Sequence, residues 1–342
     1  MEQAVCNGVP SLLLIPKLSR SFALTIPKLP PNLQSTVGVA YLLCRAVDTI
    51  EDSRLSHPDQ KVSQLENFLA AVDDANIVQD VSRHLTAELS GQVCREELDL
   101  IDNLPLLFSA LDQFSPGQQA AVRTCLRKMA SGMKSYVYRP NGLSDMGDLD
   151  QYCYVVAGVV GEMLTELFCE HCSEIDSRKE ALEKLAASFG QGLQMTNILK
   201  DIWDDKREGR CWLPKNLFDS MNLDLDDFEG ATRSPDFRPV MLQLTTTALA
   251  HLDNAVEYTL LIPRRHTGIR LFCLLAVGMA YATLNRVAQV SEFSSDYQPK
   301  ISRSTVRGIM LAAPVVCRSN SLTRWTMGGM ARLSYANAVR AS

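Results

Sequence analysis

The sequence lacks several features that would place it in common classes of protein. Its N-terminus has no basic, apolar and small-residue layout of a secretory signal, and its longest apolar run, residues 271–284, is short for a membrane span and fits a buried core helix. Most of the ten cysteines fall singly and in apolar stretches, which argues against a disulfide scaffold. We therefore expect a cytoplasmic protein in a reducing compartment.

Strand-like alternation and long linkers are also scarce. Apolar residues instead recur every three or four positions, which predicts helices over residues 37–50, 60–72, 77–90, 118–134, 149–171, 178–206, 238–261 and 267–290. No glycine-, serine- or proline-rich linker and no repeat of fixed period divides the 342 residues. The sequence predicts one all-α domain, residues 1–342, whose most apolar helices form a bundle around a central cavity: residues 37–50, 152–168, 186–200 and 269–288.

Negative charge is missing from the C-terminal end. No acidic residue follows Asp296, whereas seven basic residues do: Lys300, Arg303, Arg307, Arg318, Arg324, Arg332 and Arg340. The net charge of −5 offers no basic field for nucleic acid, and we expect no such partner. The basic tail, about residues 306–342, carries apolar patches and predicts peripheral contact with an anionic membrane. A solvated helix with scattered arginines is the alternative.

The most informative feature is a pair of short acidic clusters. Asp48 and Asp52 form one, Asp201 and Asp205 the other, and each pair has the spacing i, i+4 inside a segment that reads as helix. That spacing puts both carboxylates on one helix face, where like charges repel unless a cation neutralises them. Mg²⁺ binds carboxylate, water and phosphate oxygens. The clusters therefore predict a magnesium–diphosphate site.

Polar neighbours extend both clusters. Tyr41 and Arg45 share the first stripe, which could also be an exposed face with an ion pair from Arg45 to an aspartate. The second stripe and the sequence around it hold a further set: Gln194, Asn197, Lys200, Lys206, Arg207 and Arg210. The amide of Asn197 is a hard oxygen donor that suits Mg²⁺, and arginines grip phosphate oxygens. A solvated helix end is the alternative for the basic residues.

Two further blocks could contribute to a binding site. Ser19, Arg20, Ser21 and Phe22 lie in a non-periodic stretch, where two hydroxyls flanking an arginine could hold phosphate oxygens. Residues 152–161 place Ala157, Gly158 and Gly161 in an apolar helix, which indicates close helix packing or a ligand against bare backbone. Tyr152 opens this block and could transfer a proton; a buried tyrosine with one ordinary hydrogen bond is the alternative.

Together these blocks resemble the squalene and phytoene synthase family, the head-to-head prenyl synthases. The matching motifs are residues 19–22, 41–52, 152–161 and 194–205, in the family's order, and the resemblance covers about residues 15–305. It implies an isoprenoid-synthase-type helical bundle. A head-to-tail prenyltransferase or terpene cyclase is disfavoured, because those families usually carry Asp-Asp-x-x-Asp where this chain has a single Asp48 followed by Thr49.

The resemblance implies a squalene synthase reaction. Asp48, Asp52, Asn197, Asp201 and Asp205 would bind Mg²⁺, two farnesyl diphosphates would condense to presqualene diphosphate with Tyr152 as proton relay, and NADPH would reduce the product to squalene. Substrate would contact a larger set: Ser19, Arg20, Ser21, Phe22, Tyr41, Arg45, Gln194, Asn197, Lys200, Arg210 and Phe272. The residues around Phe22, Val156, Leu193 and Phe272 would line an apolar tunnel.

The resemblance leaves the subfamily open. The first motif, with Glu51, and the Phe272–Cys273 pair look like squalene synthases, and Lys300 and Arg303 resemble the basic stretch that helps to hold their nicotinamide cofactor. The run from Lys206 to Pro214 looks partly like phytoene synthases. A dehydrosqualene or phytoene synthase, which stops without reduction, is the alternative, and a non-catalytic relative is a third. Oligomeric state does not follow from the sequence.

Overall fold

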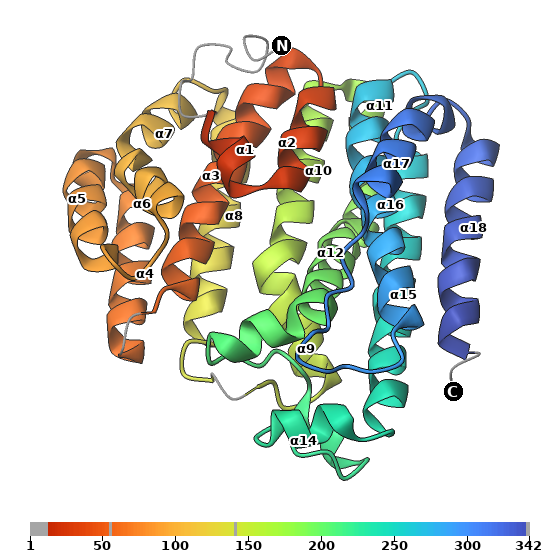
Figure 1. The fold of residues 1–342 in the computed structure, drawn as a ribbon. Helices are drawn as coiled ribbons and strands as arrows, with labels where there is room; N and C mark the ends of the chain where they lie inside the picture. Colours follow the sequence, from red (N-terminus) through yellow and green to blue (C-terminus); the bar gives the residue numbers. More distant parts are fainter. Residues whose placement is uncertain (1–12, 55–56, 140–141, 340–342) are drawn as a thin grey trace. The chain divides into compact units, whose positions relative to one another are not determined.

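The computed structural model describes residues 13–54, 57–139 and 142–339, without the side chains of residues 20 and 336–339. The chain is helical in these ranges, and no strand forms in them; Leu143 and Pro214 make one isolated bridge. Figure 1 shows the succession of helices. The expected all-α class is confirmed.

The chain forms two compact units that interleave in sequence. Unit 1 comprises Met1–Tyr138 and Glu162–Lys179, and unit 2 comprises Arg139–Gly161 and Glu180–Ser342. The boundary falls within α10, Val159–His171, and at the start of α12, Lys179–Arg207. The single domain and the central cavity expected from the sequence stay predictions.

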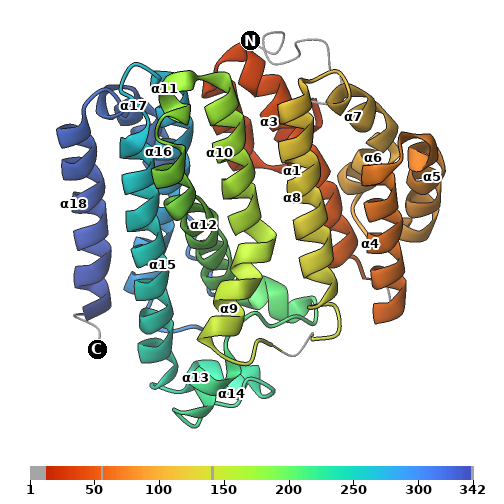
Figure 2. The same ribbon diagram turned by 180° about the vertical axis from the view of Figure 1, so that it is seen from behind.

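Unit 1 contains two long helices, α3 (Pro31–Asp52) and α8 (Pro116–Lys134), with α4 (Pro58–Asp73) beside α8. Figure 2 shows α3, α8 and α4 in succession. Leu42, Leu43 and Val47 of α3 are fully buried and form part of the core. The shorter elements are α1 (Ile15–Leu18), α2 (Arg20–Thr25), η3 (Ile26–Lys28), η4 (Ala75–Ile77), α5 (Val78–Leu89), α6 (Arg95–Asp102), α7 (Leu104–Leu111) and α11 (Ser173–Asp176).

Unit 2 is built on α12, α15 (Phe237–Leu261) and α16 (Thr267–Gln289). Two helices at the C-terminal end, α17 (Arg303–Val316) and α18 (Asn320–Val339), pack on α16, and α18 also lies along α15 (Figure 1). The basic tail is therefore two helices, and Thr323, Met327 and Ala331 of α18 are buried. The other elements are α9 (Met146–Cys153), the π-helical segment η5 (Tyr154–Gly158), α13 (Lys215–Asp219) and α14 (Phe228–Arg233).

The long helices lie close to their predicted positions, because their apolar periodicity is strong. Their starts differ where proline opens a helix: α3 begins at Pro31 rather than at residue 37, since proline suits the first helical position. Helices α6 and α7 were not predicted, because each has only eight residues and shows little periodicity. The assignment of residues 19–22 to a non-periodic stretch was wrong: Ser19 caps α2 by accepting a hydrogen bond from the Phe22 amide at 3.1 Å.

Glycine allows α12 to lie directly against the segment of unit 2 that follows Tyr152. A Cβ atom added to Gly161 would stand 2.0 Å from the Ala186 carbonyl oxygen, and one added to Gly190 would stand 2.0 Å from the Ala157 carbonyl oxygen. No side chain fits at either position. Close helix packing, one of the two readings of this block, is confirmed.

Two helical stretches are long and apolar enough to cross a membrane, Met146–His171 and Thr267–Gln289. In each, most of the apolar window is buried, 67% and 72% respectively. Buried core helices of soluble proteins have the same length and composition, and the expectation that residues 271–284 lie in a buried helix is confirmed.

Candidate functional site

The α3 cluster consists of Tyr41, Arg45, Asp48 and Asp52, which lie on one stripe of α3 in unit 1. Arg45 donates to Glu97 of α6 at 2.6 Å between Nη2 and Oε1, and its Nη1 lies 4.0 Å from Asp48 Oδ2. The side chains of Arg45 and Asp48 are each 28% exposed, and Arg45 Nε is buried with no hydrogen-bond partner. The stripe is thus a half-buried polar pocket rather than a solvated surface.

Burial raises the pKa of Asp48 to about 7; Arg45 opposes this rise, while Asp52 and Glu97 add to it. Burial alone would lower the pKa of Arg45, but the carboxylates of Asp48, Asp52 and Glu97 outweigh it and raise that pKa. One arginine therefore faces three carboxylates. An added cation would relieve the repulsion among them.

The predicted phosphate-binding block lies against this stripe. The Phe22 ring stacks on Tyr41 with centroids 4.7 Å apart, and Ser19 hydrogen-bonds the Tyr41 hydroxyl. Burial raises the pKa of Tyr41, so it is a neutral hydrogen-bonding group at physiological pH. Ser21 is exposed, and the side chain of Arg20 lies outside the described residues. The structure thus joins two predicted motifs within unit 1.

The pKa of Asp48 predicts how metal binding at the α3 cluster depends on pH. A metal ligand must be deprotonated, so the affinity for Mg²⁺ is expected to rise as the pH increases through about 7. Without metal, the same shift lowers the free energy of unfolding as the pH rises from about 4 to 7, because the folded state then binds the extra proton. Calorimetric Mg²⁺ titrations from pH ~5 to ~9 measure the affinity. Asp48→Asn is the control and should lose most of the pH dependence; an unchanged profile in that variant would contradict the assignment.

The α12 cluster consists of Gln194, Asn197, Asp201 and Asp205 in unit 2. Asp201 departs from helical geometry, with φ −107° and ψ 18°, so α12 is kinked between its two aspartates. Lys200 Nζ lies 3.0 Å from Asp201 Oδ2 and 3.3 Å from Asn197 Oδ1. Burial raises the pKa of Asp201, and the neighbouring Lys200 only partly opposes this. Unlike the α3 cluster, this cluster has a cation in contact with each carboxylate, since Arg210 lies 3.7 Å from Asp205.

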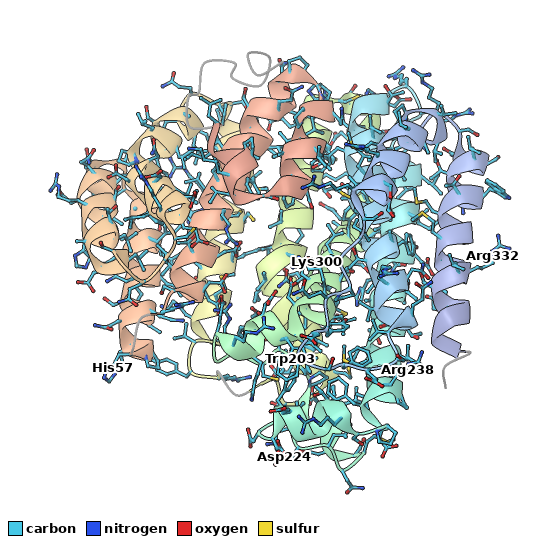
Figure 3. The ribbon with its side chains drawn as sticks, in the orientation of Figure 1. His57, Trp203, Asp224, Arg238, Lys300 and Arg332 are labelled. Atoms are coloured by element: carbon cyan, nitrogen blue, oxygen red, sulfur yellow. The ribbon has the colours of Figure 1, made fainter. Side chains whose placement is uncertain are left out.

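The segment after α16 lies along the α12 cluster. The Trp203 indole donates to the Phe293 carbonyl at 2.9 Å, and the Tyr297 hydroxyl donates to the Leu199 carbonyl at 2.7 Å. Lys300, which Figure 3 labels together with Trp203, is close enough for its charge to lower the pKa of Asp201. Arg303, the first residue of α17, is exposed. Trp203 and Tyr297, for which no role was predicted from the sequence, help to hold the segment that carries Lys300.

The basic residues after the α12 cluster have different partners. Arg210 lies 3.7 Å from Asp205 and also pairs with Glu208, and its side chain is only 13% exposed. Lys206 donates to the Leu225 carbonyl and lies over the Phe228 ring, 5.5 Å from its centroid. Arg210 thus faces the cluster, whereas Lys206 anchors the following loop.

Tyr152 and a small apolar cavity beside α12 also lie in unit 2. The Tyr152 ring is 3% exposed and stacks on Trp212, with centroids 4.1 Å apart. Phe272 is buried on α16. A cavity of about 10 Å³, room for one water molecule, has an entirely apolar lining: Leu149, Met195, Ile198, Leu199, Leu213 and Leu244. A prenyl chain would enter it only after these side chains move.

The residues that sequence reasoning missed make long-range contacts. Glu97 binds Arg45 across 52 positions, and its other carboxylate oxygen accepts from the Cys94 amide at 3.2 Å in a capping box. The only signal for Glu97 was its place near the start of a short helix. Trp212 lies in the run that ends at Pro214, and no role was predicted for it.

Both clusters suit a hard divalent cation. Each supplies two carboxylates one turn apart, and burial raises the pKa of Asp48 and of Asp201. The donors are carboxylate and amide oxygens rather than sulfur or imidazole, which favours Mg²⁺ over zinc. The residues present therefore fit magnesium.

Comparison with known proteins shows that this chain has the all-α fold of the squalene and phytoene synthases. The family model of squalene/phytoene synthases matches residues 15–305. The chain belongs to the squalene/phytoene synthase family. The resemblance stated from the four motifs is confirmed.

Curated relatives include several squalene synthases. The chain is 30% identical to squalene synthase ERG9 of Candida albicans over 276 residues, 79% of this chain and 59% of that protein. It is 29% identical to squalene synthase 1 of Arabidopsis thaliana over 274 residues, 79% of this chain and 63% of that protein. The matched part spans 56% to 64% of the length of the curated relatives.

Solved structures show the same fold. A complex of TcSQS with a ligand matches with a TM-score of 0.78 at 22% identity, covering 97% of this chain and 98% of the other. A dehydrosqualene synthase matches with a TM-score of 0.60 at 20% identity, covering 92% and 96%. At these identities the likeness establishes the fold alone.

Proposed function

We propose that this chain is a squalene synthase. It would join two farnesyl diphosphates head to head through presqualene diphosphate, with Mg²⁺, and reduce the product to squalene with NADPH. One observation carries the proposal: α3 and α12 each hold a half-buried aspartate pair, and burial raises the pKa of Asp48 and of Asp201. A bound cation would stabilise the charged form of such half-buried carboxylates.

The chain's own residues would bind and orient the diphosphates. Bound Mg²⁺, held by Asp48, Asp52, Asn197, Asp201 and Asp205, would supply Lewis-acid stabilisation of the diphosphate leaving group. The cations beside each cluster would grip phosphate oxygens, and the Tyr41 and Ser19 hydroxyls would add hydrogen bonds. The residues proposed for this role are Arg20, Ser21, Arg45, Gln194, Lys200 and Arg210.

Tyr152 is our candidate for the proton transfer that closes the cyclopropane ring. The Tyr152 ring stacks on Trp212, and this stacking would orient the Tyr152 hydroxyl. The apolar side chains behind α12 and those near Phe22 and Phe272 would exclude water from the carbocations.

NADPH would supply the hydride that ends the squalene reaction, and Lys300 and Arg303 would contact its phosphates. Lys300 also lowers the pKa of Asp201. Its charge would therefore help to bind a diphosphate at the α12 cluster as well as a cofactor. This second role favours the alternative, a dehydrosqualene or phytoene synthase, which keeps every metal ligand and needs no reductant.

A product assay tests the function. The purified chain would be incubated with farnesyl diphosphate and Mg²⁺, with and without NADPH, and the hydrocarbons identified. We expect squalene only when NADPH is present, and Lys300→Ala should then lower squalene yield more than diphosphate release. A product that ignores NADPH would assign the chain to the dehydrosqualene or phytoene branch. Absence of any diphosphate release would contradict both and favour a non-catalytic relative.

A further inference from the structure

We propose that Asp150 and His251 are positioning residues for Tyr152, and that they act by fixing the rotation of α9 about its own axis. The inference rests on the proposed function, in which Tyr152 transfers a proton. Both residues belong to a network of side-chain hydrogen bonds that joins three helices of unit 2, α9, α12 and α15. Its members are Asp150, Ser188, Gln191, His251 and Asn254.

His251 of α15 is the centre of this network. Its Nδ1 atom lies 2.8 Å from Ser188 Oγ on α12, and its Nε2 atom lies 3.3 Å from Asp150 Oδ1 on α9. The His251 side chain is only 18% exposed. Burial lowers its pKa, and the carboxylate of Asp150 only partly opposes this. We therefore expect a neutral imidazole at physiological pH.

The chemistry of these groups sets the direction of each hydrogen bond. The Asp150 carboxylate can only accept, so the Nε2 atom of the neutral His251 ring carries the proton and donates to it. The Nδ1 atom then accepts from the Ser188 hydroxyl, whose oxygen accepts in turn from Asn254 Nδ2 at 3.0 Å. Each donor in the series from Asn254 to Asp150 thus meets an acceptor, which favours one arrangement of the side chains.

Aspartate, histidine and serine bonded in this order also occur in enzymes that use serine as a nucleophile. Here, however, Ser188 lies in the interior of the long helix α12. The backbone amides around it are bonded within that helix and cannot stabilise an oxyanion. We therefore assign the network a positioning role rather than a hydrolytic one.

Gln191 of α12 holds Asp150 from a second side. Its side chain is 7% exposed, and its amide donates to Asp150 Oδ1 at 2.9 Å and to the Asp150 backbone carbonyl at 3.2 Å. The second of these bonds reaches the backbone of α9 directly. Asp150 is thus tied to α12 through Gln191 and to α15 through His251, and together these contacts oppose rotation of α9.

Tyr152 lies on the other side of α9. Residues two positions apart in an α-helix are separated by about 200° around the axis, so Asp150 and Tyr152 point in nearly opposite directions. The Tyr152 ring stacks on Trp212 with centroids 4.1 Å apart, while Asp150 contacts His251 on the far side of the helix. Loss of the Asp150 contacts would allow α9 to rotate and the Tyr152 hydroxyl to move.

Fluorine NMR of the full chain labelled with fluorotryptophan tests the proposal in two variants, His251→Phe and Asp150→Asn. The variant Trp212→Phe identifies the Trp212 signal, and Trp325, which is 71% exposed, is the internal reference. We expect both variants to shift the Trp212 signal and leave that of Trp325 in place. The reason is that the aromatic ring stacked on Trp212 would change its position.

Turnover of farnesyl diphosphate separates positioning from a general loss of structure. Both variants should lower kcat at least about tenfold and change KM by less than about twofold, because misplacement of a reacting group acts mainly on the transition state. The matched control is Gln151→Ala. Gln151 is exposed on α9 between Asp150 and Tyr152, and its replacement should change neither the Trp212 signal nor kcat.

Ser188→Ala keeps the proposal testable if the other two variants do not fold. Alanine suits the interior of α12, so this variant should fold, and it removes only the hydroxyl that bonds His251. We expect a smaller shift of the Trp212 signal in the same direction.

Two outcomes would overturn the proposal. One is a Trp212 signal that stays unchanged in all three network variants. The other is a shifted signal with unchanged kcat, since the network would then hold α9 without serving the reaction. The fluorine signal does not depend on turnover. Absence of turnover in the unaltered chain would therefore contradict the proposed function, while the Trp212 signal would still decide whether Asp150 and His251 orient the Tyr152 ring.

Discussion

Replacement of Asp201 by asparagine is expected to lower Mg²⁺-dependent diphosphate release by about a thousandfold, equivalent to ~4 kcal/mol of transition-state stabilisation. The exchange keeps the shape of the side chain but removes the charge that would hold the metal. Asp201 is half-buried and its pKa is raised, so a metal bound there would offset an unfavourable buried charge that asparagine does not carry. A coupled assay for released diphosphate, run over a range of Mg²⁺ concentrations, measures the effect.

Asp204→Asn is the matched control for Asp201→Asn. Asp204 lies on the same helix, but its side chain is 58% exposed and pairs with Arg207 at 2.5 Å. We expect this variant to keep its activity within about twofold, since exposed ion pairs contribute little. Equal losses in the two variants would mean that acidity of the helix end as a whole, not the Asp201 ligand, supports the reaction. A higher Mg²⁺ requirement in Asp201→Asn alone would identify the metal step.

The second large effect is on stability. Gly190→Ala is expected to lower the free energy of unfolding by about 3 kcal/mol or more, because the new Cβ would meet backbone atoms that cannot turn aside. The Ala157 carbonyl oxygen and carbon and the Gly158 nitrogen would lie 2.0, 2.4 and 2.8 Å away. The gain in helix propensity, at most about 1 kcal/mol, is too small to offset this. Urea denaturation followed by circular dichroism measures the change.

Gly308→Ala separates this clash from a general effect of alanine. Gly308 also lies inside a helix, α17, but a Cβ there meets nothing within 4 Å. That variant should be as stable as the unaltered chain or more stable by up to about 1 kcal/mol. If Gly190→Ala proved equally stable, α12 and η5 would have to separate easily. The orientation of Tyr152, two residues before η5, could not then depend on their contact.

The long helices could be predicted from sequence because their apolar residues repeat over many turns. The two acidic stripes could be predicted for the same reason, since residues four apart share a face once the helix is given. Helices of eight residues, such as α6 and α7, contain too few repeats to be recognised. Helix starts were placed late where proline, rather than an apolar residue, opens the element.

The partners of the acidic clusters could not be predicted, because they depend on which distant segments meet. Glu97 reaches Arg45 only through the contact of α6 with α3. Lys300 acts on the pKa of Asp201 because the segment after α16 lies along α12, where Trp203 and Tyr297 each form a hydrogen bond between the two segments. The kink at Asp201 was also not predicted, because no proline or glycine occupies that position to indicate a kink.

The π-helical turn between Tyr154 and Gly158 sets the rotational register of the residues before it. A π-turn accommodates one residue more than an α-turn, which rotates everything N-terminal to it by about 100° around the helix axis. A one-residue deletion in this turn would restore a regular ladder of hydrogen bonds. It would also swing Tyr152 away from the ring of Trp212. The extra residue therefore sets the rotation between two parts of this helical segment. Gly161 can pack against α12, while Tyr152 points in a different direction.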